Sequence, residues 1–142
     1  MERISLDETP QGMRELLLNI ELYLAKSGMD KKLLNLVKMR ASQINSCAYC
    51  LDMHSKDLRA NGETEQRLYV LDAWREAPLY TERERAALAW AEAVTKIPGG
   101  NVEDAVYEAA REQFSDEELV DLTLAVITIN SYNRINIAFR TP

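Results

Sequence analysis

The stretch Ser46-Cys47-Ala48-Tyr49-Cys50-Leu51-Asp52-Met53-His54 contains both cysteines and the single histidine of the 142-residue chain. If this stretch is helical, Cys47, Cys50 and His54 fall within about 60° of one another on one face of the helix. Two thiols and an imidazole on one face can carry thiol–disulfide chemistry, thiol–peroxide chemistry or metal binding. We expect a helix that begins at Cys47, is capped by Ser46 and ends at Asn61-Gly62.

The flanking sequence predicts further helices, which are separated by N-terminal caps and by helix-breaking residues. The expected N-terminal caps share a short polar side chain, and they are Thr9 (followed by Pro10), Asp30, Thr64, Thr81 and Ser115. Two of these caps, Thr81 and Ser115, are followed three residues later by a glutamate, which is the pattern of a capping box. Breaks are expected at Ser27-Gly28, Pro78 and Pro98-Gly99-Gly100.

The last apolar segment, from Leu119 to about Phe139, admits two interpretations. Residues 125–129 (Ala-Val-Ile-Thr-Ile) are rich in β-branched residues, which are typical of a strand. The strong cap at Ser115 and the lack of a partner strand elsewhere favour a helix. Such a helix should be central or buried between subunits, because it is apolar on most sides. We therefore predict an all-α, single-domain helical bundle that spans residues 1–142.

Composition narrows the classes of partner. Hydrophobic residues make up 46% of the chain, an ordinary share for a globular domain. Seventeen Lys and Arg stand against 23 Asp and Glu, for a net charge of −6, which disfavours nucleic acid and anionic membrane surfaces as partners. No apolar run approaches the ~20 residues of a membrane helix, and no signal peptide is visible. We expect a cytoplasmic protein, in which a close cysteine pair is catalytic, redox-active or metal-binding more often than a structural staple.

The expected helix offers two ways to activate a thiol, and each acts on a different sulfur. Cys47 would lie in the first helical turn, where the helix dipole favours a thiolate. Cys50 lies one turn before His54, so the imidazole can exchange a proton with it. Sequence reasoning alone does not rank the two. Asp57 lies near the edge of the same face.

Two other interpretations of the cysteine pair carry less weight. A cysteine on an apolar helix face is usually a small core residue, but two at this spacing beside a histidine are less easily explained by packing. A structural zinc site needs four ligands, and the chain has three Cys and His residues in all. A catalytic zinc with Asp57 or water as fourth ligand is less favoured than redox chemistry. We expect no metal and no other cofactor.

Polar residues also interrupt the last helix, and Tyr49 stands beside the thiols. We attribute Asn130, Asn133, Arg134 and Asn136 to a subunit interface, with substrate anchoring by Arg134 as a bolder alternative. Tyr49 should point away from the thiol face, as a packing residue or as part of a cleft rim.

Residues 35–54 (NLVKMRASQINSCAYCLDMH) resemble the signature of the alkylhydroperoxidase D-like core, within the carboxymuconolactone decarboxylase superfamily. The resemblance extends through residues 71–76, 80–90 and 133–140 and covers most of the chain. It implies an all-helical fold, homo-oligomers that are often trimers or hexamers, and thiol-dependent reduction of hydroperoxides with an external thiol reductant. By the same resemblance, Cys50 attacks the peroxide, Cys47 resolves the sulfenic acid and His54 belongs to a proton relay. Lactone decarboxylation, the other activity of the superfamily, is not expected to use a cysteine pair.

One position departs from the family pattern. The relay normally includes a glutamate where this chain has Asn35, and an amide takes no proton at neutral pH. Either another carboxylate supplies the function, with Asp57 the nearest in sequence, or the relay is weakened. Our hypothesis is a thiol-dependent peroxidase that is weak by family standards. The alternative is a redox sensor or interaction protein in which the disulfide alters an oligomer interface with little turnover.

Overall fold

The computed structural model describes all 142 residues and contains helices and no strands, as predicted. Seven α-helices and three short 3₁₀ helices follow one another along the chain. The α-helices are α1 (Gln11–Lys26), α2 (Lys31–Asn45), α3 (Ala48–Ala60), α4 (Glu65–Tyr69), α5 (Glu82–Lys96), α6 (Asp104–Gln113) and α7 (Asp116–Phe139). The 3₁₀ helices are η1 (Leu6–Glu8), η2 (Leu71–Ala73) and η3 (Pro98–Gly100).

Local capping explains where most helices begin. Thr81 and Ser115 each form a complete capping box with the glutamate three residues on. Residues 125–129 lie within α7, so the strand interpretation of this segment is wrong. Asp30 accepts a hydrogen bond from the Lys32 amide at 3.0 Å and starts α2. The prediction for α1 is off by one residue, because Pro10 is the cap and Gln11 is the first helical residue.

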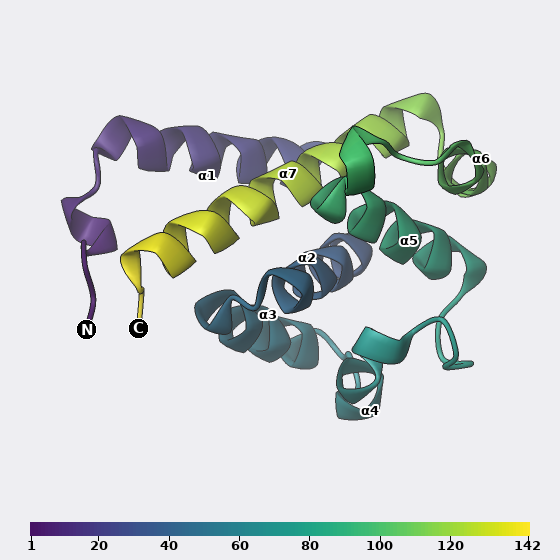
Figure 1. Cartoon of the computed structure of the whole chain (residues 1–142), viewed down its shortest axis with the longest axis horizontal. Helices are drawn as coiled ribbons and strands as arrows, with labels where there is room; N and C mark the ends of the chain where they lie inside the picture. Colours follow the sequence, from purple (N-terminus) through teal and green to yellow (C-terminus); the bar gives the residue numbers. More distant parts are fainter.

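Helix α2 is the element around which the others pack (Figure 1). It contacts α3, α5 and α7, and α7 also lies along α1. The largest apolar cluster lies mainly between α2, α5, α6 and α7, with buried residues such as Val37, Leu122 and Val126. A second cluster fills the space between α2, α3, α4 and α5 around Leu58, Leu71 and Leu88. A small third cluster holds both cysteines, so the thiols lie inside the bundle.

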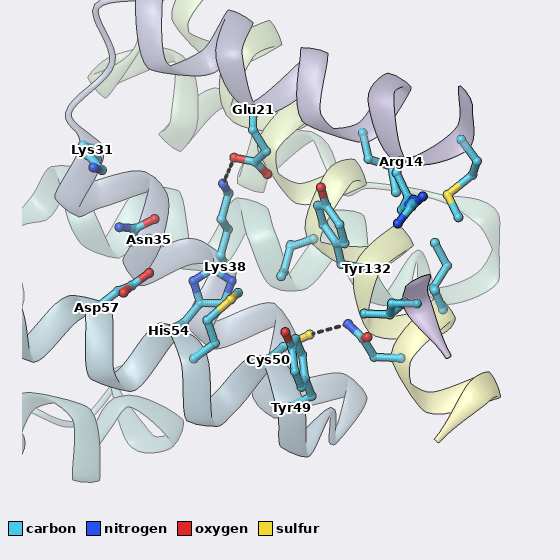
Figure 2. Close-up of a pocket in the computed structure, with 17 residues that line it drawn as sticks. Arg14, Glu21, Lys31, Asn35, Lys38, Tyr49, Cys50, His54, Asp57 and Tyr132 are labelled. Atoms are coloured by element: carbon cyan, nitrogen blue, oxygen red, sulfur yellow. Dashed lines mark hydrogen bonds and ion pairs between the residues drawn. The ribbon is translucent and has the colours of Figure 1, made fainter. Parts of the chain in front are cut away.

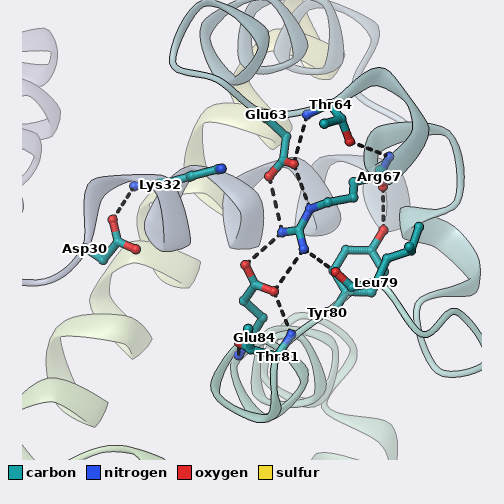
Figure 3. Close-up of polar contacts among 9 residues, drawn as sticks. All are labelled: Asp30, Lys32, Glu63, Thr64, Arg67, Leu79, Tyr80, Thr81 and Glu84. Carbon is teal, nitrogen blue, oxygen red and sulfur yellow. Dashed lines mark hydrogen bonds and ion pairs between the residues drawn. The ribbon is translucent and has the colours of Figure 1, made fainter.

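The segment between α3 and α5 is held by one arginine (Figure 3). Arg67 donates to Glu63 and to Glu84, at 2.7 Å in each case, and its guanidinium lies over the Tyr80 ring. The Tyr80 hydroxyl donates in return to the Arg67 carbonyl. These contacts tie α4 to the start of α5, and we assign them a structural role.

The two chain ends meet on one side of the bundle (Figure 1). The Arg3 amide donates to the Phe139 carbonyl at 2.8 Å, and the Arg3 guanidinium donates to the Ala138 carbonyl at 3.1 Å. This contact brings η1 against the C-terminal half of α7. As a result, Leu6 of η1 lines the same cavity as α1, α2, α3 and α7.

Candidate active site

A sharp turn between α2 and α3 places the cysteines. Ser46 has a left-handed backbone conformation (φ 56°) and ends α2, because its amide donates to the Ser42 and Gln43 carbonyls. Cys47 then serves as the N-cap of α3, and Ala48 is the first helical residue. The expectation that Ser46 caps a helix starting at Cys47 is therefore wrong, and Cys47 is not in the first turn of the helix.

The two sulfurs face each other despite this shift. Cys47 and Cys50 are both free thiols, each with 1% of its surface exposed, and their Sγ atoms are 2.8 Å apart. Cys50 lines a cavity, whereas Cys47 does not and is packed behind it with Ala41 and Ile129. A molecule in the cavity therefore meets the sulfur of Cys50 first.

The cavity has a volume of about 470 Å³ and lies between α1, α2, α3 and α7 (Figure 2). Met13, Leu17, Met53, Ile129 and Ile135 give it a largely apolar wall. Its polar and charged lining comes from Arg14, Glu21, Lys31, Asn35, Lys38, His54, Asp57 and Asn136. Tyr49 also lines it, which confirms the interpretation of Tyr49 as part of a cleft rim.

The environment of Cys50 disfavours its thiolate. Burial raises the pKa of the Cys50 thiol to about 11, with a further contribution from the hydrogen bond with Cys47. The side-chain amides of Asn133 and Asn136 act in the opposite direction and lower this pKa, and Asn136 donates to Cys50 Sγ at 3.4 Å. At neutral pH Cys50 rests as a thiol, and its nucleophilic reactivity depends on a proton acceptor.

His54 shares the cavity with Cys50 and is the candidate proton acceptor, although it is a weak base. It is 7% exposed, and burial lowers its pKa to about 4, with a further contribution from the positive charge of Lys38. Its Nδ1 atom is buried without a hydrogen-bond partner. The imidazole is therefore neutral at pH 7, with a ring nitrogen free for proton exchange.

An ion pair that sequence reasoning missed lies in the same cavity. Lys38 of α2 is 6% exposed, and its Nζ lies 2.5 Å from Glu21 Oε2 of α1 (Figure 2). The available signal was a lysine within the otherwise apolar run from Leu36 to Met39, because a buried lysine requires a partner. The partner itself comes from another helix and has no sequence signature.

Asn35 and Asp57 both line the cavity, as their place in the sequence suggested. Neither side chain hydrogen-bonds to His54, so no carboxylate orients the imidazole directly. The charges of Asp57 and Glu21 raise the pKa of His54, but by less than burial and Lys38 lower it. Their part in a proton relay stays a prediction.

The polar residues of α7 act within the subunit. Asn133 is fully buried, donates to Ser42 Oγ at 3.0 Å and accepts from Asn45 at 2.9 Å. Asn136 is 5% exposed and donates to Cys50. The interface interpretation is therefore wrong for these two asparagines, which pack α7 against α2 and α3.

Arg134 does not reach the cavity. Its guanidinium donates to Asn130 Oδ1 one turn earlier on α7, at 2.7 Å, and the side chain is exposed. The interpretation of Arg134 as a substrate anchor is thus wrong. His54, the two cysteines and Asp57 also do not converge into a cluster of the kind that holds a metal ion.

The comparisons with known proteins agree with this geometry. The model of the carboxymuconolactone decarboxylase family matches residues 10–93, and the chain belongs to this family. The uncharacterized protein YdfG of Bacillus subtilis is 44% identical over 138 residues, which cover 96% of this chain and 93% of YdfG. None of the seven α-helices combines the length and the apolar character needed to cross a membrane.

Solved structures show the same fold. ATU0492 of Agrobacterium tumefaciens, a protein of unknown function suggested to be the antioxidant defence protein AhpD, has a TM-score of 0.95 and 42% identity. The match covers 100% of this chain and 97% of that one. The alkylhydroperoxidase AhpD core of an uncharacterized peroxidase-related protein from Ralstonia eutropha JMP134 has a TM-score of 0.80 and 23% identity. That match covers 92% of this chain and 70% of the other, and it supports the AhpD-like fold.

Proposed function

We propose that the protein is a thiol-dependent peroxidase that reduces organic hydroperoxides through a Cys47–Cys50 disulfide cycle. One observation carries the proposal: two free sulfurs lie 2.8 Å apart, and one of them shares a cavity with a neutral histidine. The apolar wall and the volume of about 470 Å³ suit a hydroperoxide with an organic group better than hydrogen peroxide alone.

The first half of the cycle oxidises Cys50. The Cys50 thiol gives its proton to His54, and the thiolate attacks the peroxide oxygen that bears hydrogen. The O–O bond breaks, Cys50 becomes a sulfenic acid, and the departing alkoxide takes the proton from His54 and leaves as an alcohol. Two electrons pass from sulfur to the peroxide, and no net proton is gained or lost.

The second half of the cycle closes the disulfide. The Cys47 sulfur attacks the Cys50 sulfenic acid, the S–O bond breaks, and the hydroxide leaves with the Cys47 proton as water. A thiol reductant then returns two electrons and two protons to the pair. The position of Cys47, behind Cys50 and off the cavity wall, supports the proposal that it resolves the sulfenic acid rather than attacks the peroxide.

The test counts thiols before and after addition of cumene hydroperoxide. We expect the wild type to lose both thiols and Cys50→Ser to lose none. Cys47→Ser should stop at a sulfenic acid that dimedone traps. Full retention of both wild-type thiols in excess hydroperoxide would overturn the proposal.

A redox sensor with little turnover is the second candidate. The raised pKa of Cys50 and the amide at Asn35 favour it, since both slow repeated turnover.

We also propose that the chain forms a homo-oligomer, a trimer or a hexamer, in the cytoplasm. Exposed apolar side chains such as Leu16 of α1 and Ile127 of α7 support an assembly. Measuring the mass of the oligomer in the reduced and the oxidised protein separates the sensor from the peroxidase. A sensor changes its oligomeric state on oxidation, whereas a peroxidase turns over without such a change.

A further inference from the structure

Asn136 of α7 combines three features that the disulfide cycle leaves unused. It is 5% exposed and lines the cavity, and its Nδ2 donates to Cys50 Sγ at 3.4 Å, the dashed line from Cys50 in Figure 2. Its Oδ1 is buried and has no hydrogen-bond partner. A buried amide oxygen without a donor is unfavourable, so this oxygen is available to accept a hydrogen bond from a molecule in the cavity.

The neighbouring Asn133 also lowers the pKa of Cys50, but its amide oxygen is not free to accept from a ligand. Asn133 lies one turn earlier on the same face of α7. Its Nδ2 donates to Ser42 and its Oδ1 accepts from Asn45, so both ends of this amide are occupied. These contacts hold α7 against α2 and thereby fix where Asn136 meets Cys50. The amide with a free acceptor beside the sulfur is therefore that of Asn136.

The chemistry of a hydroperoxide matches the two ends of this amide. The reacting sulfur becomes an anion and needs a donor, whereas the attacked oxygen carries a hydrogen and needs an acceptor. The donor and the acceptor of one planar amide stand side by side. A hydroperoxide whose O–H points at Oδ1 would hold that oxygen next to Cys50 Sγ.

We propose that Asn136 is a catalytic residue whose amide N–H donates to the Cys50 thiolate and whose Oδ1 accepts the O–H of the hydroperoxide. The contact with the thiolate stands independently of the substrate, whereas the contact with the peroxide rests on the proposed function. One side chain then aligns the nucleophile and the oxygen that it attacks.

The test uses protein that carries Cys47→Ser, so that Cys50 is the single thiol. We compare Asn136→Leu with Asn130→Leu, a matched change on the same helix, because Asn130 donates to Thr95, accepts from Asn45 and neither contacts Cys50 nor lines the cavity. Two rates are measured against pH: alkylation of Cys50 by methyl iodoacetate, which has no hydrogen-bond donor, and sulfenic acid formation with cumene hydroperoxide.

In Asn136→Leu we expect alkylation at a fixed pH below the pKa to fall about tenfold, as for loss of one hydrogen bond to the thiolate. The hydroperoxide rate should fall by about a further tenfold, because the hydroperoxide donates its O–H to Oδ1 and methyl iodoacetate has no donor. Asn130→Leu should change neither rate. If Asn136→Leu does not fold, Asn136→Asp replaces it; this variant removes the donor, adds a negative charge beside the sulfur and should also slow alkylation.

An unchanged alkylation rate in both Asn136 variants would overturn the contact with the thiolate. Equal falls in the two rates of Asn136→Leu would overturn the contact with the peroxide. If Cys50 of the parent protein does not react with the hydroperoxide, the proposed function fails together with the peroxide contact. The alkylation rates still decide the thiolate contact in that case.

Discussion

One buried side chain, His54, should contribute measurably to the loss of stability of this protein in acid. The pKa of His54 is about 4 in the native protein, against 6.5 for an ordinary histidine. At about 1.4 kcal/mol per pH unit, this difference corresponds to about 3 kcal/mol of folding free energy. The physical cause is the burial of the imidazole, to which the charge of Lys38 adds.

The sign follows from where the proton binds. Between pH 6.5 and about 4 the unfolded chain binds a proton at His54 and the native protein does not. The free energy of unfolding therefore falls as the pH falls through this window. Above pH 6.5 the contribution of His54 is fully present, and below about pH 4 it has been lost.

The assay is urea unfolding at several pH values from 7 to 4, compared with the same series for His54→Gln. Carboxylates with lowered pKa, such as Glu92 and Glu84, also lose stability in acid, but they do so equally in both proteins. The wild type should lose about 3 kcal/mol more than the variant. Because His54 is the only histidine, its imidazole NMR signal gives the native pKa directly.

Parallel stability curves for the two proteins would refute this reasoning. An NMR titration with a midpoint near 6.5 would refute it as well. Either result would mean that water hydrates the imidazolium inside the cavity, and His54 would then be partly protonated at neutral pH rather than a free proton acceptor.

Three further predictions follow from the same geometry. Lys38→Met should raise the pKa of His54, because a nearby positive charge is lost, and the same NMR titration measures it; a lower pKa would contradict this. Asn35→Glu should increase hydroperoxide turnover, because it places a carboxylate in the cavity, and no gain counts against a weakened relay. Ser115→Ala should cost about 1 kcal/mol in urea unfolding through loss of the α7 cap, with thiol reactivity unchanged; a slower thiol would show that the cap also positions the site.

The features that the sequence predicted well are those set by local contacts. The capping boxes at Thr81 and Ser115 join residues three apart, so the sequence contains both partners. The Cys-X-X-Cys-X-X-X-His spacing likewise brings Cys50 and His54 to one wall of a cavity by helical periodicity alone. The exact start of α3 was missed because a serine is equally suited to begin a helix and to occupy the turn that ends one.

The features that the sequence did not predict come from distant helices. Glu21 lies 17 residues before its partner Lys38, and Asn136 lies 86 residues after Cys50. No spacing rule links residues so far apart, and their contacts exist because α1 and α7 pack across the cavity. Polar residues on an apolar helix gave a signal for Asn133 and Asn136, but the signal did not distinguish the interior of one subunit from an interface between subunits.

The amide at Asn35 affects the site by leaving the cavity without one negative charge near His54. A glutamate at this position would add a negative charge to the cavity and favour the imidazolium. In this protein that task falls to Asp57 and Glu21, and Glu21 is already paired with Lys38, whose charge acts in the opposite direction. The imidazole is consequently a weak base facing a weakly acidic thiol. Stabilisation of the thiolate by Asn136 therefore matters more to this site than it would with a glutamate at position 35.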